Sequence, residues 1–325
     1  MLWVWVVVVS LAAGGTGAAA STELVFYSTV PRDLSEALVK GYEAKYPDVK
    51  VSLWQAGVET VLEKMELETR GTGRPKADVV WIEEPAAMDR FAKRGLLEKY
   101  PPKDSEQIPA VYRDKEGYWT GNHVGHTMIF YNNRLVPKEQ APKSWKDMAD
   151  PRFKNKLGLS NPKISGTGAA LASAMVQLYG WKFWEDVAKN RPLLAPGTQA
   201  MVSTVIQGER LLAATQDYTI AAAIRKGQPI GFTFPEEGVF PFGAYVGIVK
   251  GTQGLEAARN FVDFFVSKDT AAIMHRLGMY HTRIDAPAPE GWPPIGQIKL
   301  LPFNWEEHER DKPAMKKRFS GLMGG

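Results

Sequence analysis

Short apolar runs alternate with amphipathic helical segments along this chain, and this alternation restricts its fold more than any other feature of the sequence. Glu23–Ser28 has the composition of a strand, and an apolar residue then recurs every four positions over residues 34–46, which predicts a helix. Val49–Trp54 alternates apolar and polar side chains as a second strand, and Val58–Thr69 has the pattern of a second helix. Ala77–Ile82 adds a third strand. Repeated βα units predict an α/β fold, in which helices cover the faces of a sheet.

The length and composition are those of a large globular protein and do not suggest nucleic-acid binding. At 325 residues the chain exceeds what one hydrophobic core usually supports, so we expect two lobes. Lys and Arg number 40 against 36 Asp and Glu, and because the basic residues are scattered, they favour small anionic ligands over nucleic acid. Cysteine is absent, which excludes disulfides, thiolate metal sites, a cysteine nucleophile and a lipoprotein anchor.

Residues 1–20 have the pattern of a secretory signal peptide. Leu2–Leu11 is almost wholly apolar, and the small residues Ala12–Ala20 follow before Ser21. The apolar stretch is too short to span a bilayer, and the usual Lys or Arg is missing from its start. We therefore expect residues 1–20 to be removed when the protein is exported.

The stretch Ser160–Gly168 has the features of a loop that leads into a helix. Pro162 and two glycines disfavour helix within it, whereas the alanine-rich residues 169–176 favour helix strongly. The first N–H groups of a helix have no partner within it and carry partial positive charge, so together with the hydroxyls of Ser165 and Thr167 they predict an oxyanion site. The alternative is that these hydroxyls only cap the helix.

Other polar residues are expected at the ends of neighbouring strands. Glu83 and Glu84 follow the third strand, at the edge where ligands bind in open α/β sheets. Because adjacent side chains on an extended chain point to opposite faces, one carboxylate would lie in the cleft and the other in solvent; the alternative is that both are solvated loop residues. Asp217 and Tyr218 follow the strand at residues 210–215 in the same way.

The sequence gives little support for catalysis or for a resident metal. His123 and His126 lie three residues apart on a predicted strand, which places them on opposite faces and disfavours a shared metal ion. The serine-hydrolase elbow, the HExxH pattern and the phosphate-loop lysine motif do not occur. We therefore expect a binding protein and not an enzyme.

Short motifs follow one another in a definite order along nearly the whole chain after residue 20. They are Tyr27-Ser28, Lys45-Tyr46-Pro47, Ala77-Asp78-Val79-Val80-Trp81, Gly95-Leu96-Leu97, Ala149-Asp150-Pro151-Arg152-Phe153-Lys154, Ser165-Gly166-Thr167 and Pro235-Glu236-Glu237-Gly238. Together they resemble the periplasmic solute-binding proteins of ABC importers. The subgroup is the one usually labelled ferric-ion-binding, which also includes binders of phosphorylated sugars and phosphonates.

The resemblance implies a type II periplasmic binding protein fold, with two α/β lobes joined by two crossing strands and a ligand cleft between them. The crossings would be Gly121–Tyr131 and Phe242–Val249. Lobe 1 would comprise residues 21–124 plus 246–285, lobe 2 residues 125–245, and a linker with a surface helix residues 286–325. The resemblance also implies a monomeric periplasmic receptor, without a cofactor, that passes its solute to an ABC permease and ATPase in the inner membrane.

The resemblance leaves two classes of ligand as alternatives. The family's iron site would place a histidine in the first loop, a glutamate after the third strand and two consecutive tyrosines; here Glu83 and Tyr218 match, while the histidine is missing and Asp217 replaces the first tyrosine. Because this set is short of ligands for Fe³⁺, a small phosphate- or phosphonate-bearing anion is favoured, and the alternative is transported Fe³⁺ held by Glu83 and Tyr218 with a synergistic anion. The expected ligand-binding residues are Tyr27, Ser28, Thr29, Arg32, Glu83, Lys163, Ser165, Gly166, Thr167, Asp217, Tyr218 and Glu237.

Overall fold

A computed structural model describes residues 22–324, so the signal peptide expected over residues 1–20 lies outside the described part. The α-helices are α1 (Arg32–Lys45), α2 (Val58–Thr72), α3 (Pro85–Lys93), α4 (Gly166–Tyr179), α5 (Trp181–Lys189), α6 (Thr198–Ile206), α7 (Asp217–Arg225), α8 (Leu255–Phe265), α9 (Lys268–Arg276) and α10 (Trp305–Met323). The strands are β1 (Thr22–Ser28), β2 (Val49–Gln55), β3 (Val79–Ile82), β4 (Thr120–Asn132), β5 (Gly158–Ser160), β6 (Leu193–Ala195), β7 (Leu212–Gln216), β8 (Ile230–Thr233), β9 (Phe240–Ile248) and β10 (Tyr280–His281).

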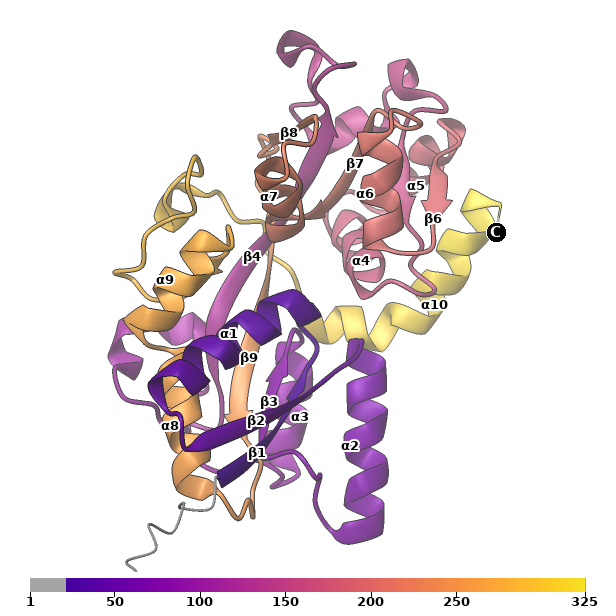
Figure 1. Ribbon diagram of the computed structural model, residues 1–325. Coiled ribbons are helices and arrows are strands. Elements are labelled where there is room, and N and C mark those ends of the chain that lie inside the picture. Colours follow the sequence, from indigo (N-terminus) through magenta and orange to yellow (C-terminus); the bar gives the residue numbers. More distant parts are fainter. Residues whose placement is uncertain (1–21, 325) are drawn as a thin grey trace, which may run out of the picture.

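The long strands β4 and β9 run from one lobe into the other (Figure 1). The main sheet has the order β10-β4-β9-β3-β1-β2, and β7 and β8 pair with the second half of β4. β1 is parallel to β2 and β3, whereas β9 is antiparallel to β3 and to β4. The expected pair of crossing strands is thus confirmed. The lobe boundaries expected at residues 124–125 and 245–246 fall inside these two strands and stay predictions.

Aromatic side chains fill the cores of both lobes. Phe26 of β1 meets Phe261 of α8 edge to face, with ring centroids 5.0 Å apart. In the second lobe, Trp184 of α5 packs in the same way against Phe319 of α10, at 4.9 Å. Such pairs contribute about 0.5–1.5 kcal/mol beyond the burial of their surface. The C-terminal helix therefore belongs to the core of the second lobe along its inner face.

A glycine on β4 allows the crossing strands to lie close together. Gly125 pairs with Phe242 of β9, and a Cβ atom at Gly125 would lie 2.1 Å from the Phe242 ring. Because protein interiors are close-packed, a larger residue would have to push this ring aside. Phe242 also packs against Tyr218, with ring centroids 5.9 Å apart. Gly125 thereby helps to fix the position of aromatic rings at the base of the interlobe space.

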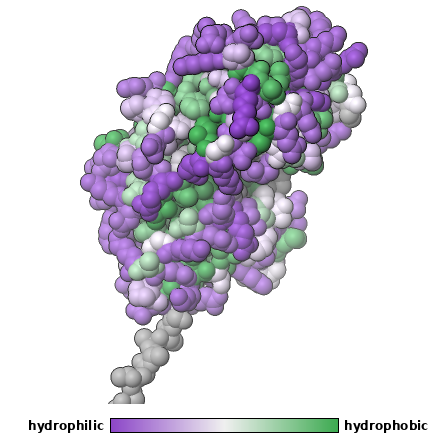
Figure 2. Space-filling view, turned by 45° about the horizontal axis from the view of Figure 1, so that its top comes forward, coloured by the Kyte–Doolittle hydropathy of each residue, from purple (hydrophilic) through white to green (hydrophobic). Residues whose placement is uncertain are grey.

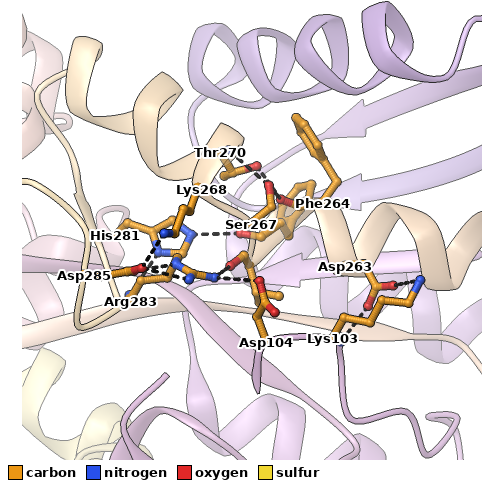
Figure 3. A network of polar contacts seen from close by, with 12 residues as sticks. Lys103, Asp104, Asp263, Phe264, Ser267, Lys268, Thr270, His281, Arg283 and Asp285 are labelled. Carbon is orange, nitrogen blue, oxygen red and sulfur yellow. Dashed lines mark hydrogen bonds and ion pairs between the residues drawn. The ribbon is translucent and has the colours of Figure 1, made fainter. Parts of the chain in front are cut away.

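A buried arginine ties the segment after β10 to the rest of the first lobe (Figure 3). The Arg283 side chain is 2 % exposed and makes two contacts with Asp285, Nε to Oδ1 at 2.7 Å and Nη2 to Oδ2 at 3.1 Å. Its Nη1 also reaches Asp104, at 3.3 Å, and donates to the Val266 carbonyl at 2.9 Å. Planar bidentate geometry of this kind makes strong, orienting hydrogen bonds. The network has a structural role, because none of its members lines the interlobe cavity.

The outline of the face seen in Figure 2 is largely hydrophilic, and hydrophobic residues gather towards its middle on both lobes. Large exposed apolar side chains such as Val111 and Ile164 lie at separate places in the sequence. Within residues 22–324, none of the helices combines the length and the apolar character needed to cross a bilayer.

Candidate functional site: the cleft between the lobes

A cavity of about 320 Å³ lies between the lobes. The first lobe contributes Thr29 and Glu83 from the loops that follow β1 and β3, and the second contributes Gly166 and Thr167 from the start of α4. The crossing strands contribute Thr127 and Phe242. A second compartment adjoins it, since both share Thr29, Glu83, Thr167 and Gln216, and it adds Arg32 and Tyr218. The cavity thus lies at the ends of strands from both lobes, as expected for an α/β fold.

The start of α4 combines a capped helix end with open backbone donors. The Ser165 hydroxyl accepts a hydrogen bond from the Gly168 N–H at 3.1 Å, so Ser165 is the N-cap residue. Gly168 is required for packing, because a Cβ atom there would lie 2.4 Å from the Ser160 carbonyl oxygen. The N–H groups of Gly166 and Thr167 begin the helix and have no partner within it. Both residues line the cavity, so the positive end of α4 faces the cleft.

Glu83 is positioned by Thr29 and is poorly solvated. The Thr29 hydroxyl accepts a hydrogen bond from the Glu83 N–H at 2.9 Å and lies 3.5 Å from the Trp81 carbonyl oxygen, to which it donates. One carboxylate oxygen of Glu83, Oε1, is buried without a hydrogen-bond partner among residues 22–324. Burial raises the pKa of Glu83 to about 8, and hydrogen bonding with Tyr218 offsets only part of this effect. The group is therefore predominantly a neutral carboxylic acid at neutral pH.

Glu84 also lines the cavity, so the expectation that one of the two glutamates would face solvent is wrong. Glu84 is 5 % exposed, and its carboxylate forms an ion pair with Arg90, in which Nη2 of Arg90 lies 3.1 Å from Oε1 of Glu84. Glu84 is the first residue before α3, where the chain turns and both side chains can point into the space between the lobes. Burial raises the pKa of Glu84, and the Arg90 charge acts in the opposite direction.

Asp217 is committed to the structure of the crossing region and not to the cavity. α7 begins at Asp217, which places Asp217 and Tyr218 in its first turn. Asp217 Oδ2 accepts hydrogen bonds from the His126 N–H at 3.0 Å and pairs with His126 Nδ1 at 2.9 Å, while Oδ1 accepts from the Tyr218 N–H at 2.7 Å. His123 instead places Nδ1 against the Tyr280 carbonyl, at 2.9 Å. The two histidines thus have separate partners.

Six of the twelve expected ligand-binding residues line the two compartments: Thr29, Arg32, Glu83, Gly166, Thr167 and Tyr218. The other six do not line them: Tyr27, Ser28, Lys163, Ser165, Asp217 and Glu237. The Tyr27 hydroxyl donates to Glu68 at 2.9 Å, and Ser28 bonds to Ser35 at 2.8 Å. The Glu237 carboxylate accepts from Ser144 and Tyr179, and Lys163 is exposed on the loop before α4. Apart from Lys163, these side chains make contacts within the protein around the cleft.

Sequence reasoning missed several cavity residues. Gln216 at the end of β7 lines both compartments, and its Oε1 accepts a hydrogen bond from the Tyr218 hydroxyl at 2.8 Å. Trp305, His308 and Lys312 come from α10, which was expected only as a surface helix. The charged pattern of that segment gave no sign that one of its faces meets the cleft.

Among the described residues, no group of three or more His, Cys, Asp and Glu side chains is arranged to hold a metal ion.

Comparison with known proteins identifies a family with this architecture. Residues 74–295 match the family model described as bacterial extracellular solute-binding protein. A putative 2-aminoethylphosphonate-binding periplasmic protein of Salmonella typhimurium is 23 % identical, over 72 % of this chain and 69 % of that protein.

Two solved structures have the same fold. Iron-bound HitA from Pseudomonas aeruginosa superposes with a TM-score of 0.79 at 20 % identity, covering 92 % of this chain and 99 % of HitA. The periplasmic binding protein AfuA from Actinobacillus pleuropneumoniae, with fructose-6-phosphate bound, superposes with a TM-score of 0.78 at 23 % identity, covering 93 % and 99 %. These similarities confirm the type II periplasmic binding fold. Because the family match covers more than half of the chain, this protein belongs to the family of bacterial extracellular solute-binding proteins.

Proposed function

We propose that this receptor captures a small organic anion, carrying a phosphate or phosphonate group, in the interlobe cleft and delivers it in the periplasm to the permease and ATPase of an ABC importer. Membership of a solute-binding family supports transport as the role of the chain. The AfuA structure holds a sugar phosphate, and the Salmonella relative is named for a phosphonate. Phosphorus oxyanions are therefore the first class of ligand to test.

The observation that carries this proposal is that Glu83 and the start of α4 line one cavity from opposite lobes. Thr167 and the first N–H groups of α4 offer donors to an oxyanion. Glu83 is largely protonated at neutral pH, because its pKa is about 8, so it can donate a hydrogen bond instead of repelling the ligand. Arg32 and Lys312 add positively charged side chains to the cleft lining, and each is paired with a glutamate of its own helix, Glu36 and Glu309 respectively.

The size of the cavity favours an organic ligand over a bare ion. Its volume of about 320 Å³ lies at the lower end of the range of about 300–1,000 Å³ that is usual for small-molecule sites. A single ion would leave most of this space to water or to an accompanying anion. The apolar walls, which include Phe240 and Phe242, also suit a ligand with carbon atoms.

Calorimetry with defined probes tests the proposal. The mature protein is titrated with fructose 6-phosphate, 2-aminoethylphosphonate and ferric citrate in two buffers that differ in heat of ionisation, which yields the number of protons exchanged on binding. We expect a phosphorus oxyanion to bind without proton release, because Glu83 stays protonated beside it. Failure of both organic probes to bind, together with binding of iron, would overturn the proposal.

Ferric iron is the second candidate, because Glu83 and Tyr218 line the same compartment. Burial, followed by the nearby Glu83 charge, raises the pKa of Tyr218 well above its ordinary value. Iron binding would therefore have to displace protons from both side chains. Release of about two protons per Fe³⁺ and a visible tyrosinate-to-iron colour would support this alternative, and a colourless protein without proton release would exclude it.

A further inference from the structure

One face of α10 forms a wall of the cleft, although this helix lies at the C-terminal end of the chain. Trp305, His308 and Lys312 all line the cavity between the lobes. Residues three, four and seven apart lie on the same side of a helix, so these three side chains form a single stripe, here called the α10 face. Figure 1 shows α10 running between the lobes and then along the second lobe. Pro313 lies inside this helix.

The α10 face is held firmly on the second lobe. The Gln177 side chain on α4 donates to the Asn304 carbonyl and accepts from the Asn304 N–H, both at 3.0 Å. His308 is 3 % exposed, and its Nδ1 lies 2.8 Å from the Ser173 hydroxyl, also on α4. Phe319 is buried further along the helix. The α10 face is thus fixed relative to the start of α4, which lines the same cavity.

The same helix also reaches the first lobe. Glu309 Oε2 lies 3.8 Å from Arg90 Nη1, and the Lys312 ammonium lies 3.3 Å from Glu309 Oε1. The charge of Lys312 also acts on the buried carboxylate of Glu84, on the opposite wall. The Lys312 side chain is 14 % exposed, so its charge is only partly screened by water. α10 therefore adds an aromatic wall with a Lys312–Glu309 ion pair to the cavity that the start of α4 also lines.

We propose that the α10 face is a second subsite, which binds the organic part of a ligand whose phosphate or phosphonate group sits at the start of α4. This inference rests on the proposed function. Lys312 supplies an ammonium donor for hydroxyl, carbonyl or carboxylate oxygens, and the Trp305 ring supplies a flat apolar surface. His308 holds the wall in place, because its Nδ1 contacts Ser173 and its Nε2 lies 3.6 Å from Glu309 Oε1. The ligand class is then a hydroxylated or carboxylated organophosphate or organophosphonate. Inorganic phosphate fills only the subsite at α4.

The test compares fructose 6-phosphate with inorganic phosphate as probes, by calorimetry, on the mature protein and four variants. Lys312→Met removes the charge at nearly constant length, Lys312→Arg restores it, and Trp305→Ala removes the ring. Lys317→Met is the matched control, because Lys317 is exposed on the same helix. The melting temperature of every variant is recorded to establish that it is folded.

We expect wild type and the Lys317 variant to bind fructose 6-phosphate more tightly than phosphate. Lys312→Met should weaken binding of fructose 6-phosphate by about tenfold, as for loss of one charged hydrogen bond, and should change phosphate binding less than about twofold. Lys312→Arg should recover most of the lost affinity for fructose 6-phosphate. Trp305→Ala should also reduce the preference for fructose 6-phosphate over inorganic phosphate. A preference that survives in folded Lys312→Met and Trp305→Ala would overturn the second subsite and leave the proposed function standing. Equal wild-type affinity for the two probes, or binding of neither, would overturn the second subsite, whereas the proposed function is overturned only when 2-aminoethylphosphonate also fails to bind and iron binds.

Discussion

Replacing Glu83 with glutamine should change how the stability of the empty receptor depends on pH. Burial raises the pKa of Glu83 to about 8 in the folded protein, whereas an unfolded glutamate has a pKa of about 4.3. Between these values the folded state keeps a proton that the unfolded state has released. The free energy of unfolding therefore falls as pH rises through this window, and the contribution of Glu83 is fully present only below the unfolded pKa.

The size of the effect follows from the width of that window. One fully displaced proton changes the free energy of unfolding by about 1.4 kcal/mol per pH unit. Between pH 5 and pH 7, Glu83 should thus cost wild type about 2–3 kcal/mol. Glutamine has nearly the same shape and cannot ionise, so this contribution is absent from Glu83→Gln.

Urea unfolding at pH 5, 6, 7 and 8 measures this contribution as the difference between wild type and Glu83→Gln. Other titrating groups cancel in the difference, and Glu290→Gln, at an exposed position, is the control. We expect Glu83→Gln to gain stability relative to wild type as pH rises, while the control tracks wild type. A wild-type minus Gln difference that stays constant from pH 5 to pH 8 would refute the neutral, buried state of Glu83, and with it the argument that Glu83 can donate to an anion.

Three further predictions concern the start of α4 and the buried arginine of the first lobe. Ser165→Ala should lower the free energy of unfolding by about 1 kcal/mol and have little effect on the affinity for fructose 6-phosphate. Thr167→Ala should lower that affinity by about tenfold and have little effect on the melting temperature. The reverse pattern in calorimetry and thermal melts would contradict our assignment of Ser165 as the cap and Thr167 as the ligand donor. Gly168→Ala should destabilise by about 1–3 kcal/mol in urea despite the helix propensity of alanine, because the new Cβ would lie 2.4 Å from the Ser160 carbonyl oxygen, and a variant as stable as wild type would show that α4 can shift. Arg283→Ala should lower stability by about 2 kcal/mol and raise the pKa of Asp285, which the Arg283 guanidinium now holds at about 2; an unchanged Asp285 titration by NMR would disprove the coupling.

Most elements of the fold are predictable from local sequence, and the exceptions have physical causes. α7 begins at Asp217, where Oδ1 accepts the Tyr218 N–H and Oδ2 is held by His126, a contact that no local pattern predicts because His126 lies 91 residues away along the chain. α9 and the two-residue strand β10 were not expected. β10 is defined by its pairing with β4, and no local pattern of two residues can specify such a pairing.

The candidate site was predictable in part. Residues at strand ends and at the start of α4 could be found, because parallel strands and the helices that follow them bring those ends to one edge of the sheet. The sequence did not allow us to predict which of these side chains turn towards the cleft. Tyr27 occupies the expected position, yet its hydroxyl donates to Glu68 on α2 and the ring lies beneath the Lys64 ammonium, at 5.3 Å.

The sequence by itself determined the βα alternation, the loop that leads into α4, and the family, since all of these depend on residues close together in the chain. Tertiary structure alone decided that the Glu83 carboxylate lies beside Tyr218 with Oε1 buried, that Ser165 caps α4 while Thr167 lines the cavity, and that α10 lines one side of the cleft. The contact between His308 and Ser173 joins residues 135 apart. Burial and pKa depend on such distant contacts, because they are set by what surrounds a side chain in space and not by its neighbours in sequence.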